Sequence, residues 1–236
     1  MKVSVIVPVY RGEHLLAPLL QAVARQTLPP TETWIVETEA TDATRRLAET
    51  HGATHVPVQQ ANFDHAGTRT EIAKRASGDF LIFLTQDAVP HGSQAFERLV
   101  AALIEDECIA AAYGRQVPDD GAHPISRVKR SFNYPEESLT KSYEDRHRLG
   151  LRTASLSNAF AAYRRRTLAE VGYFGSRQLM CEDVRTAAAL LLAGYKIHSA
   201  GDAVVRHTHD HDLWTELRRY FDIGVAHSRL AWIAVH

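Results

Sequence analysis

The sequence has few cysteines, no excess of basic residues and no long hydrophobic run, and each absence argues against a class of protein. The two cysteines, Cys108 and Cys181, lack the CxxC spacing of zinc or redox motifs, which indicates a reduced, intracellular protein. The formal net charge of -1 argues against nucleic-acid binding driven by attraction to phosphates. No apolar segment approaches the about 20 residues that span a bilayer, and the first residues form a strand pattern rather than a signal peptide. We therefore expect a cytoplasmic protein, with peripheral association at the inner face of a membrane left open.

Strand and helix patterns alternate along the first half of the chain. The length of 236 residues, 45% of them hydrophobic, suits one domain with a full core. Strand patterns cover residues 3–9, 33–36, 54–58, 80–84 and 108–113, and helical spacing follows the first strand, begins again at 41, and covers 67–76 and 93–104. Such alternation predicts an α/β fold, a mostly parallel sheet flanked by helices with right-handed crossovers. Cys108, at the start of the strand pattern 108–113, is expected in the core.

The regular pattern fails between residues 116 and 153. Proline, glycine and charged residues mix there without periodicity, which predicts a long loop acting as a lid or binding loop. Beyond it, residues 157–163 form a strand pattern and 183–192 a helical pattern that ends before Gly194. Two short strand patterns, 196–199 and 203–207, precede a final helix with an apolar face.

Asp87 follows the apolar strand pattern 80–84 through Thr85 and Gln86. A carboxylate at the carboxyl end of a central parallel strand lies in the crevice where open α/β sheets bind ligands. Such a group can hold a divalent cation against a phosphate. The sequence therefore predicts a metal-assisted phosphate site at Asp87.

Two further acidic positions are candidates for the same crevice. Glu37 follows the second strand pattern, where a carboxylate can accept hydrogen bonds from a base or ribose, and Asp42 can either do the same or cap a helix. Glu182 and Asp183 stand at the start of a helical pattern, where the helix dipole keeps a carboxylate ionised, as a general base must be. The alternative for this pair is simple helix capping.

Histidines cluster in the segment His207-Thr208-His209-Asp210-His211. Residues at i and i+2 of a strand share a face, so His207 and His209 can approach one ion. Imidazole suits Zn, Mn and similar metals, although a solvated loop would also explain the cluster. A stand-alone structural zinc site has little support, because HExxH and CxxC are absent.

The segment from Asn62 to Arg69 combines a glycine with an arginine at the start of a helical pattern. Gly67 permits close approach of a backbone, and Arg69 can reach a phosphate or base from the first helical turn. The segment is neither a Walker loop nor a GxGxxG motif, so it predicts neither ATP nor NAD binding.

Taken together, these stretches resemble the inverting family-2 glycosyltransferases, which have the GT-A fold. The matching pieces occur in family order between residue 2 and about residue 224: residues 5–10, 37–44, 65–69, 83–88 and 182–183. The stretches 85–90, 113–116 and 207–210 are similar to a rhamnosyltransferase-like subgroup.

The resemblance implies a role for each matching residue. It implies a nucleotide-binding set of Pro8, Val9, Tyr10, Glu37, His65, Gly67, Arg69, Gln86 and Asp87. A divalent cation, Mg or Mn, would be held by Asp87 with His207 or His209. Asp183 would be the general base, with Glu182 beside it.

Residues 1–211 would form the GT-A domain, with 1–115 as its nucleotide-binding half and 116–211, including loop 116–153, as its acceptor and catalytic half. Residues 212–236 would form a C-terminal helical segment. Because its pattern stays apolar, we expect it to be truncated, and contact of this end with a membrane or partner is the alternative.

The implied activity is transfer of a sugar from a nucleotide donor to a hydroxyl group. The subgroup resemblance implies L-rhamnose from dTDP-L-rhamnose and, as acceptor, a cell-surface glycan or its lipid-linked precursor. Another donor such as a UDP-hexose, a nucleotide-binding module without catalysis, and a metal-dependent hydrolase built on the histidine cluster are the alternatives.

Overall fold

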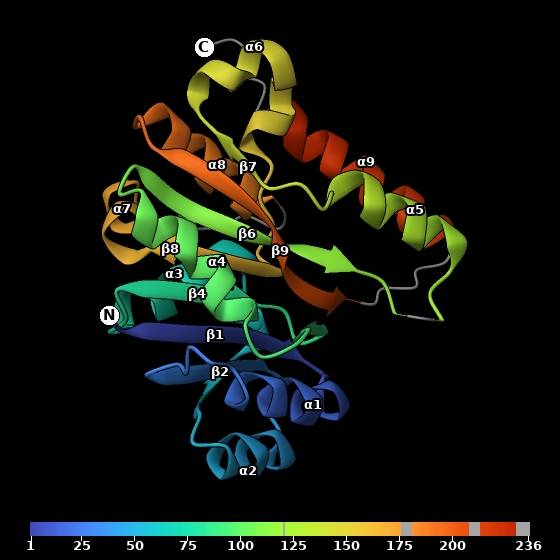
Figure 1. The fold of residues 1–236 in the computed structure, drawn as a ribbon. Coiled ribbons are helices and arrows are strands. Elements are labelled where there is room, and N and C mark those ends of the chain that lie inside the picture. The colour runs from blue at the N-terminus through green and yellow to red at the C-terminus, as the bar shows by residue number, and fades with distance from the viewer. Residues whose placement is uncertain (120, 176–180, 208–212, 230–236) are drawn as a thin grey trace.

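The computed structural model describes residues 1–119, 121–175, 181–207 and 213–229 of the chain (Figure 1). The strands are β1 (Val3–Tyr10), β2 (Glu32–Thr38), β3 (Thr54–Val58), β4 (Phe80–Leu84), β5 (Ala88–Pro90), β6 (Ile109–Val117), β7 (Leu139–Lys141), β8 (Phe160–Arg164) and β9 (Lys196–His207). The helices are α1 (Glu13–Ala24), α2 (Asp42–Thr50), α3 (His65–Arg75), α4 (Ala95–Glu105), α5 (Pro124–Asn133), α6 (Arg146–Leu149), α7 (Arg165–Glu170), α8 (Glu182–Leu192) and α9 (Leu213–Arg229).

The strands form one sheet in the order β3-β2-β1-β4-β8-β6-β9-β5, with β7 also paired to β9. The pairings give β1, β2, β3, β4, β6 and β9 one direction, while the short strands β5, β7 and β8 run the opposite way. The sheet is therefore mostly parallel, as the sequence predicted. Because β1 and β4 are parallel neighbours, Tyr10 and the segment that follows β4 meet at one edge, where α/β sheets bind ligands.

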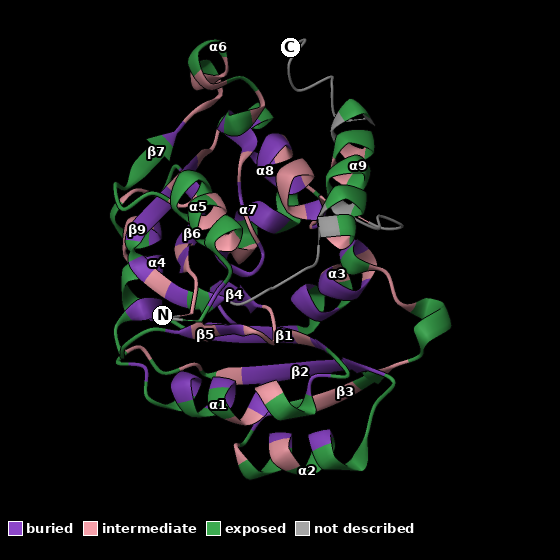
Figure 2. Ribbon diagram, turned by 90° about the vertical axis from the view of Figure 1, so that its right-hand side faces the viewer, coloured by how far each residue is buried: buried purple, intermediate pink, exposed green. Residues whose placement is uncertain are grey.

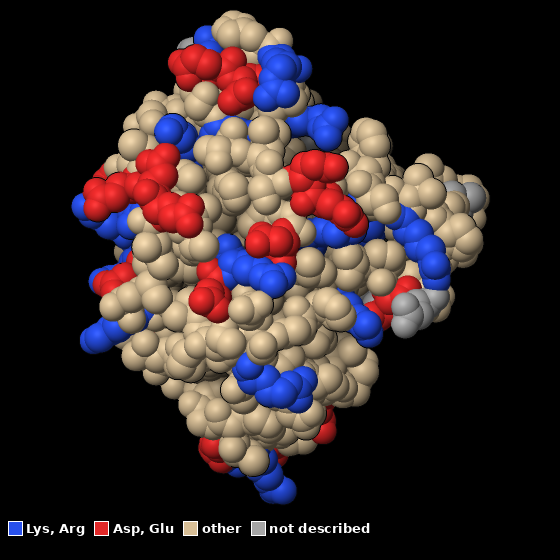
Figure 3. All heavy atoms as spheres, in the orientation of Figure 1, with Lys and Arg blue, Asp and Glu red and all other residues tan. Residues whose placement is uncertain are grey.

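Helices cover both faces of the sheet, which explains why its strands read as nearly continuous apolar runs. In β1, Val3, Val5, Val7 and Val9 pack in one core cluster with α1 and α4, and Ile6 packs in the other with α3 and α8. Figure 2 shows the buried residues concentrated on the strands and on the helix faces that cover them. Figure 3 shows acidic and basic residues interspersed on one face of the molecule, in agreement with the near-zero net charge.

The predicted long loop 116–153 is wrong, because the segment is built from short elements. β6 continues to Val117, and α5, β7, α6 and two 3₁₀ turns follow before β8. Pro124 occupies the first turn of α5, where its missing N–H costs nothing, and His123 accepts from the backbone N–H of Ile125. The prolines and glycines that hid the periodicity therefore mark the ends of short elements.

Two smaller predictions also need correction. The strand patterns 196–199 and 203–207 belong to one strand, β9, which continues through an irregular register beside Gly114 and Arg115 of β6. Cys108 is exposed, not buried in the core, because it lies in a turn before β6. In this turn the backbone N–H of Cys108 donates to Asp106 Oδ1 at 2.8 Å.

None of the helices in the described ranges combines the length and the hydropathy that a membrane span needs.

Candidate functional site

A cavity of about 920 Å³ opens at the edge of the sheet where β4 and β9 end. Its lining includes His65 and Arg69 of α3, Glu182 and Asp183 of α8, and His207 at the end of β9. The helices α5 and α9 also contribute to its wall, and Figure 2 shows α5 to the left of α9 in the upper half of the molecule. The fold thus brings five of the predicted site residues to one cavity.

Asp87 and His207 form a close pair at this edge. His207 Nε2 lies 3.2 Å from Asp87 Oδ2, and their side chains are 7% and 10% exposed. The pairing of β5 with β9 sets Ala88 opposite His207, which holds the two side chains together. On its other side, His207 Nδ1 lies 2.7 Å from Gln116 Oε1.

The Asp87–His207 pair is chemically suited to a divalent cation. One carboxylate oxygen and one imidazole nitrogen are ligands that Mn accepts, and Mg accepts the carboxylate. Among the described residues, no group of three or more His, Cys, Asp or Glu side chains could hold a metal. The pair therefore supplies part of a coordination shell, which a diphosphate and water would have to complete. His209, the other predicted ligand, lies outside the described residues.

Gln86 is tied to the backbone at the end of β1. Its Oε1 accepts from Tyr10 N at 2.8 Å, and its Nε2 donates to Tyr10 O at 3.1 Å. Gly12 makes room for this contact, since a Cβ atom there would lie 2.1 Å from Gln86 Oε1. The structure thus places Gln86 as a link between β1 and the segment after β4, beside the predicted nucleotide residues Pro8, Val9 and Tyr10.

Glu37 lies at the end of β2 and is 1% exposed. Its Oε2 accepts from Thr41 N at 3.1 Å and lies 2.9 Å from His55 Nε2. These contacts tie β2 to β3 and to the start of α2. The helix is capped by Thr41, whose side chain accepts from Thr44 N, so the alternative that Asp42 is the cap is wrong.

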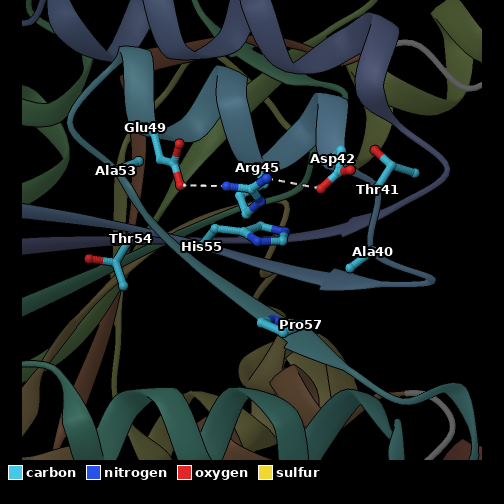
Figure 4. Close-up of a pocket in the computed structure, with 9 residues that line it drawn as sticks. All are labelled: Ala40, Thr41, Asp42, Arg45, Glu49, Ala53, Thr54, His55 and Pro57. Carbon is cyan, nitrogen blue, oxygen red and sulfur yellow. Dashed lines mark hydrogen bonds and ion pairs between the residues drawn. The ribbon is translucent and has the colours of Figure 1, made fainter.

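A second hollow, of about 670 Å³, lies between α2 and β3 (Figure 4). Its charged side chains are already paired, since Arg45 contacts both Asp42 and Glu49 at 3.0 and 3.2 Å. His55 lies below Arg45 in Figure 4 and contacts Glu37. The predicted base and metal residues do not line this hollow.

Arg69 and Glu182 form a buried ion pair between α3 and α8. Arg69 Nη1 lies 3.2 Å from Glu182 Oε1, and the two side chains are 6% and 8% exposed. Arg69 also donates to His65 O at 3.1 Å, and Asn158 Nδ2 donates to Glu182 Oε1 at 3.1 Å. Burial alone would raise the pKa of Glu182, but the Arg69 charge and the Asn158 hydrogen bond hold it below its usual value. Glu182 therefore stays an anion.

Asp183 has a different environment from its neighbour Glu182. Burial, together with the negative charge of Glu182, raises the pKa of Asp183 to about 7. Its Oδ1 accepts from Val184 N at 2.8 Å and its Oδ2 from Asn158 N at 3.3 Å. Two adjacent carboxylates with pKa values shifted in opposite directions, in a cavity, are typical of an acid–base site.

The local backbone sets these two carboxylates at the start of α8. Cys181 precedes the helix with a positive φ of 62°, a left-handed conformation that is uncommon for a non-glycine residue, and it caps no backbone group with its side chain. Both acids occupy the first turn, close to the positive end of the helix. The capping alternative accounts only for the Val184 contact, whereas Asn158 engages both acids.

The cap of α3 explains why position 67 is a glycine. Asp64 caps α3 by accepting from Gly67 N at 2.6 Å, and a Cβ atom at Gly67 would lie 2.4 Å from Asp64 Oδ2. Thr70, one turn later, donates to Gly175 O at 2.9 Å and accepts from Phe174 N at 3.2 Å. These contacts fix α3, and with it His65 and Arg69, against the segment that leads towards α8.

The sequence analysis missed three residues that organise the site: Gln116, Asn158 and Tyr163. Asn158 contacts both acids of α8 and accepts from Tyr163 OH at 2.7 Å. Gln116 is 1% exposed and contacts His207. These residues are hard to recognise as site residues in the sequence, because each is a neutral polar residue at the boundary of an apolar strand pattern.

Comparison with known proteins gives a consistent set of similarities. Residues 4–172 match the model of the family described as Glycosyl transferase family 2. The O-antigen chain rhamnosyltransferase RfbN of Salmonella typhimurium is 38% identical over 235 residues, which are 99% of this chain and 74% of that protein. The O-antigen chain rhamnosyltransferase WbaN of Salmonella anatum is 38% identical over 232 residues, covering 98% of this chain and 73% of that protein.

Solved structures show the same fold at lower identity. The mannosyltransferase PcManGT from Pyrobaculum calidifontis, in complex with GDP-Man and Mn2+, superposes with a TM-score of 0.67 at 20% identity. The alignment covers 92% of this chain and 59% of that one. For S. aureus TarS 1-349 the TM-score is 0.65 at 22% identity, covering 87% of this chain and 59% of that one. The chain thus spans about three quarters of the two rhamnosyltransferases and 59% of the two solved chains.

Proposed function

The chain belongs to glycosyl transferase family 2, and from this premise we propose that it transfers L-rhamnose from dTDP-L-rhamnose to a hydroxyl of a cell-surface glycan or its lipid-linked precursor. The family, the enzyme class and the GT-A fold predicted from the sequence are confirmed. Rhamnose as the sugar is supported by the two rhamnosyltransferases that match nearly the whole chain.

The observation that carries the proposal is the environment of Asp183. It lies in the wall of the large cavity with a pKa near 7, where a general base at neutral pH is most effective. The cavity wall also contains His207, and its partner Asp87 would supply the oxygen ligand of a cation. A base in the wall of a cavity, beside a pair suited to a cation that holds a diphosphate, is what direct transfer to a hydroxyl requires.

In the proposed reaction, Asp183 accepts the proton of the acceptor hydroxyl. The acceptor oxygen forms a bond to the anomeric carbon while the bond from that carbon to the diphosphate oxygen breaks, and the nucleoside diphosphate leaves with the electron pair. One displacement inverts the anomeric centre. The electrostatic stabilisation of the leaving diphosphate is what a divalent cation held by Asp87 and His207 would supply. Glu182, anchored by Arg69 and Asn158, keeps its charge beside Asp183 and maintains the raised pKa of that base.

A screen of nucleotide sugars tests the proposed donor. We expect dTDP-L-rhamnose to bind in the presence of Mn2+ more tightly than UDP-glucose, UDP-N-acetylglucosamine or GDP-mannose, measured by calorimetry. The anomeric configuration of the product, read by NMR, should be inverted. Tighter binding and turnover of a UDP-hexose would replace the donor and leave the mechanism in place. Binding without transfer to any hydroxyl acceptor would favour the nucleotide-binding module.

Replacing Asp87 by asparagine is expected to weaken Mn2+-dependent donor binding at least about tenfold, because a neutral amide is a poorer ligand for a hard cation. The measurement is calorimetric titration of dTDP with and without Mn2+. Asp106→Asn is the matched control, since Asp106 is a surface carboxylate paired with Lys196 at 3.0 Å. Unchanged affinity of the Asp87→Asn variant in Mn2+ would remove Asp87 from the metal site.

We place the proposed activity at the cytoplasmic face of a membrane, with the helices α5 and α9 as the surface that meets anionic lipid. Large apolar side chains are exposed on α5 (Ile125, Val128, Phe132) and on α9 (Trp214, Leu217, Tyr220, Phe221). The α5 sequence contains three basic residues and no acidic one, which complements an anionic surface. Both helices line the cavity, so a lipid-linked acceptor held at this surface would lie beside Asp183.

Cosedimentation with phosphatidylglycerol vesicles tests this surface. We expect the protein to sediment with these vesicles and much less with phosphatidylcholine vesicles, and Val128→Asp, at an exposed position of α5, to reduce sedimentation. Turnover of a soluble acceptor analogue should be unchanged in that variant. Equal sedimentation of wild type and variant would show that α5 is not the docking surface.

A further inference from the structure

Gln116 occupies a buried position between two halves of the proposed site. It lies on β6, in register with Val205 of the neighbouring strand β9, two residues before His207. Its Oε1 lies 2.7 Å from His207 Nδ1, and its Nε2 donates to Ser157 Oγ at 2.9 Å. Ser157 directly precedes Asn158, which contacts Glu182 and Asp183. The Gln116 side chain therefore links the Asp87–His207 pair to the segment that contacts the two carboxylates of α8.

The orientation of the Gln116 amide follows from its other partners. Arg130 of α5 donates through Nη1 to Gln116 Oε1. Because a guanidinium has only donors, the atom that it contacts must be the amide oxygen. The amide nitrogen then faces Ser157, whose hydroxyl can accept. The same oxygen faces His207, and it can only accept.

The orientation of the amide determines the protonation of the His207 ring. Since Gln116 Oε1 cannot donate, His207 Nδ1 must carry the hydrogen of their 2.7 Å contact. Asp87 Oδ2, 3.2 Å from Nε2, also only accepts, so in the protein without metal each ring nitrogen can donate one hydrogen bond, and a cation at Asp87 would displace only the hydrogen on Nε2. A hydrogen bond from one ring nitrogen is how proteins commonly orient a histidine that ligates a metal through the other.

We propose that Gln116 is a positioning residue that fixes the Nδ1–H tautomer of His207 and so presents Nε2, beside Asp87, to the divalent cation of the donor complex. Arg130 holds the amide in the required orientation and thereby couples the placement of α5 to that of His207. The proposal rests on the proposed function for the identity of the ligand. The hydrogen on Nδ1 is a property of the protein without ligand, so it can be tested separately.

The experiment uses Gln116→Leu, which removes the acceptor at similar size, and Gln116→Glu, which keeps an acceptor oxygen. In protein labelled with ¹⁵N-histidine and free of metal, NMR reads whether Nδ1 of His207 carries a hydrogen, with the signal assigned by His207→Gln. We expect a hydrogen on Nδ1 in wild type and in Gln116→Glu, and a ring that keeps only the hydrogen on Nε2, facing Asp87, in Gln116→Leu. Mn2+ affinity in the presence of dTDP, measured by electron paramagnetic resonance, should fall about 10- to 100-fold in Gln116→Leu.

Gln26→Leu is the matched control. Gln26 is also a buried glutamine, but among the described residues its amide hydrogen-bonds to the backbone, at Ala22, Gly92 and Phe96. Its replacement should lower thermal stability without changing the His207 tautomer or Mn2+ affinity. If Gln116→Leu does not fold, Arg130→Met is the second variant, and partial loss of the Nδ1–H form is expected because the amide is no longer held in one orientation.

An unchanged hydrogen on Nδ1 together with unchanged Mn2+ affinity in Gln116→Leu would overturn the proposal. A wild-type ring without a hydrogen on Nδ1 would overturn it as well. Failure of the proposed function has a different signature, because wild type would then bind neither Mn2+ nor nucleotide sugar while the tautomer experiment would still report on Gln116.

Discussion

Asp183→Asn is expected to lower kcat for sugar transfer by about 10³-fold, within the range that general-base catalysis contributes, while donor binding stays close to that of wild type. Asparagine keeps the size of the side chain but cannot accept the proton of the acceptor hydroxyl. Single-turnover kinetics and calorimetric donor binding on the same preparation separate the two effects. Wild-type turnover in this variant would show that another group is the base.

Asp42→Asn provides the matched control for Asp183→Asn. Both residues are acids in the first turn of a helix, but Asp42 lies at the surface of α2, where it pairs with Arg45 at 3.0 Å. Its replacement should leave kcat unchanged. The comparison separates loss of a first-turn carboxylate in general from loss of the proposed base.

The pH dependence of wild type gives a second readout of Asp183. Burial and the charge of Glu182 raise the pKa of Asp183 to about 7. A general base must be ionised, so kcat/KM in the free enzyme should rise with pH up to about 7 and then level off. Because Glu182 and Asp183 are adjacent and interact, the apparent value belongs to the pair. An acid limb centred near 4, the ordinary value for a solvated aspartate, would contradict the raised pKa.

Arg69→Met is expected to destabilise the fold by about 3–5 kcal/mol, the usual effect of leaving one charge of a buried ion pair without its partner. Glu182 lies 3.2 Å from Arg69, and both side chains are almost completely buried. Urea unfolding measures the loss. The double variant Arg69→Met/Glu182→Gln should recover part of it, because the orphaned charge is then removed as well.

Arg45→Met is the matched control for this prediction, since Arg45 is also an ion-paired arginine, but its two carboxylate partners lie with it at the surface of α2. Such exposed pairs contribute little to stability, and little change is expected. If Arg69→Met instead keeps wild-type stability and loses nucleotide affinity, Arg69 is the nucleotide ligand that the sequence motif predicted. The two outcomes separate the structural from the ligand-binding role of this residue.

Hydrophobic periodicity predicted the elements of the first half well, because each strand and helix there has its own apolar pattern. It failed between residues 116 and 153. There the helix α5 has no buried residue, and β7 has three residues of which only Lys141 is buried. Elements that bury so little apolar surface leave no periodic signal. Their presence depends on contacts far along the chain, such as the pairing of β7 with β9.

The site residues divide in a similar way. Asp87, Asp183 and His207 could be predicted because a charged or imidazole side chain beside an apolar strand or a helix start is conspicuous in sequence. Gln116 and Asn158 could not, because a neutral amide becomes significant only through its partners. Their partners are distant in sequence: His207 is 91 positions from Gln116, and Asp183 is 25 from Asn158.

The sequence by itself determined the alternating α/β order, the position of Asp87 after a central strand and the acids at the start of α8, because these depend on local pattern and chain direction. The tertiary structure decided which groups share an environment. It pairs the buried Glu182 with Arg69 and buries Asp183 beside the negative charge of Glu182, and so separates the pKa values of two adjacent carboxylates. It also sets Gln116 against His207. The physical reason is that burial, ion pairing and hydrogen-bond direction depend on distances between segments, which only the folded chain fixes.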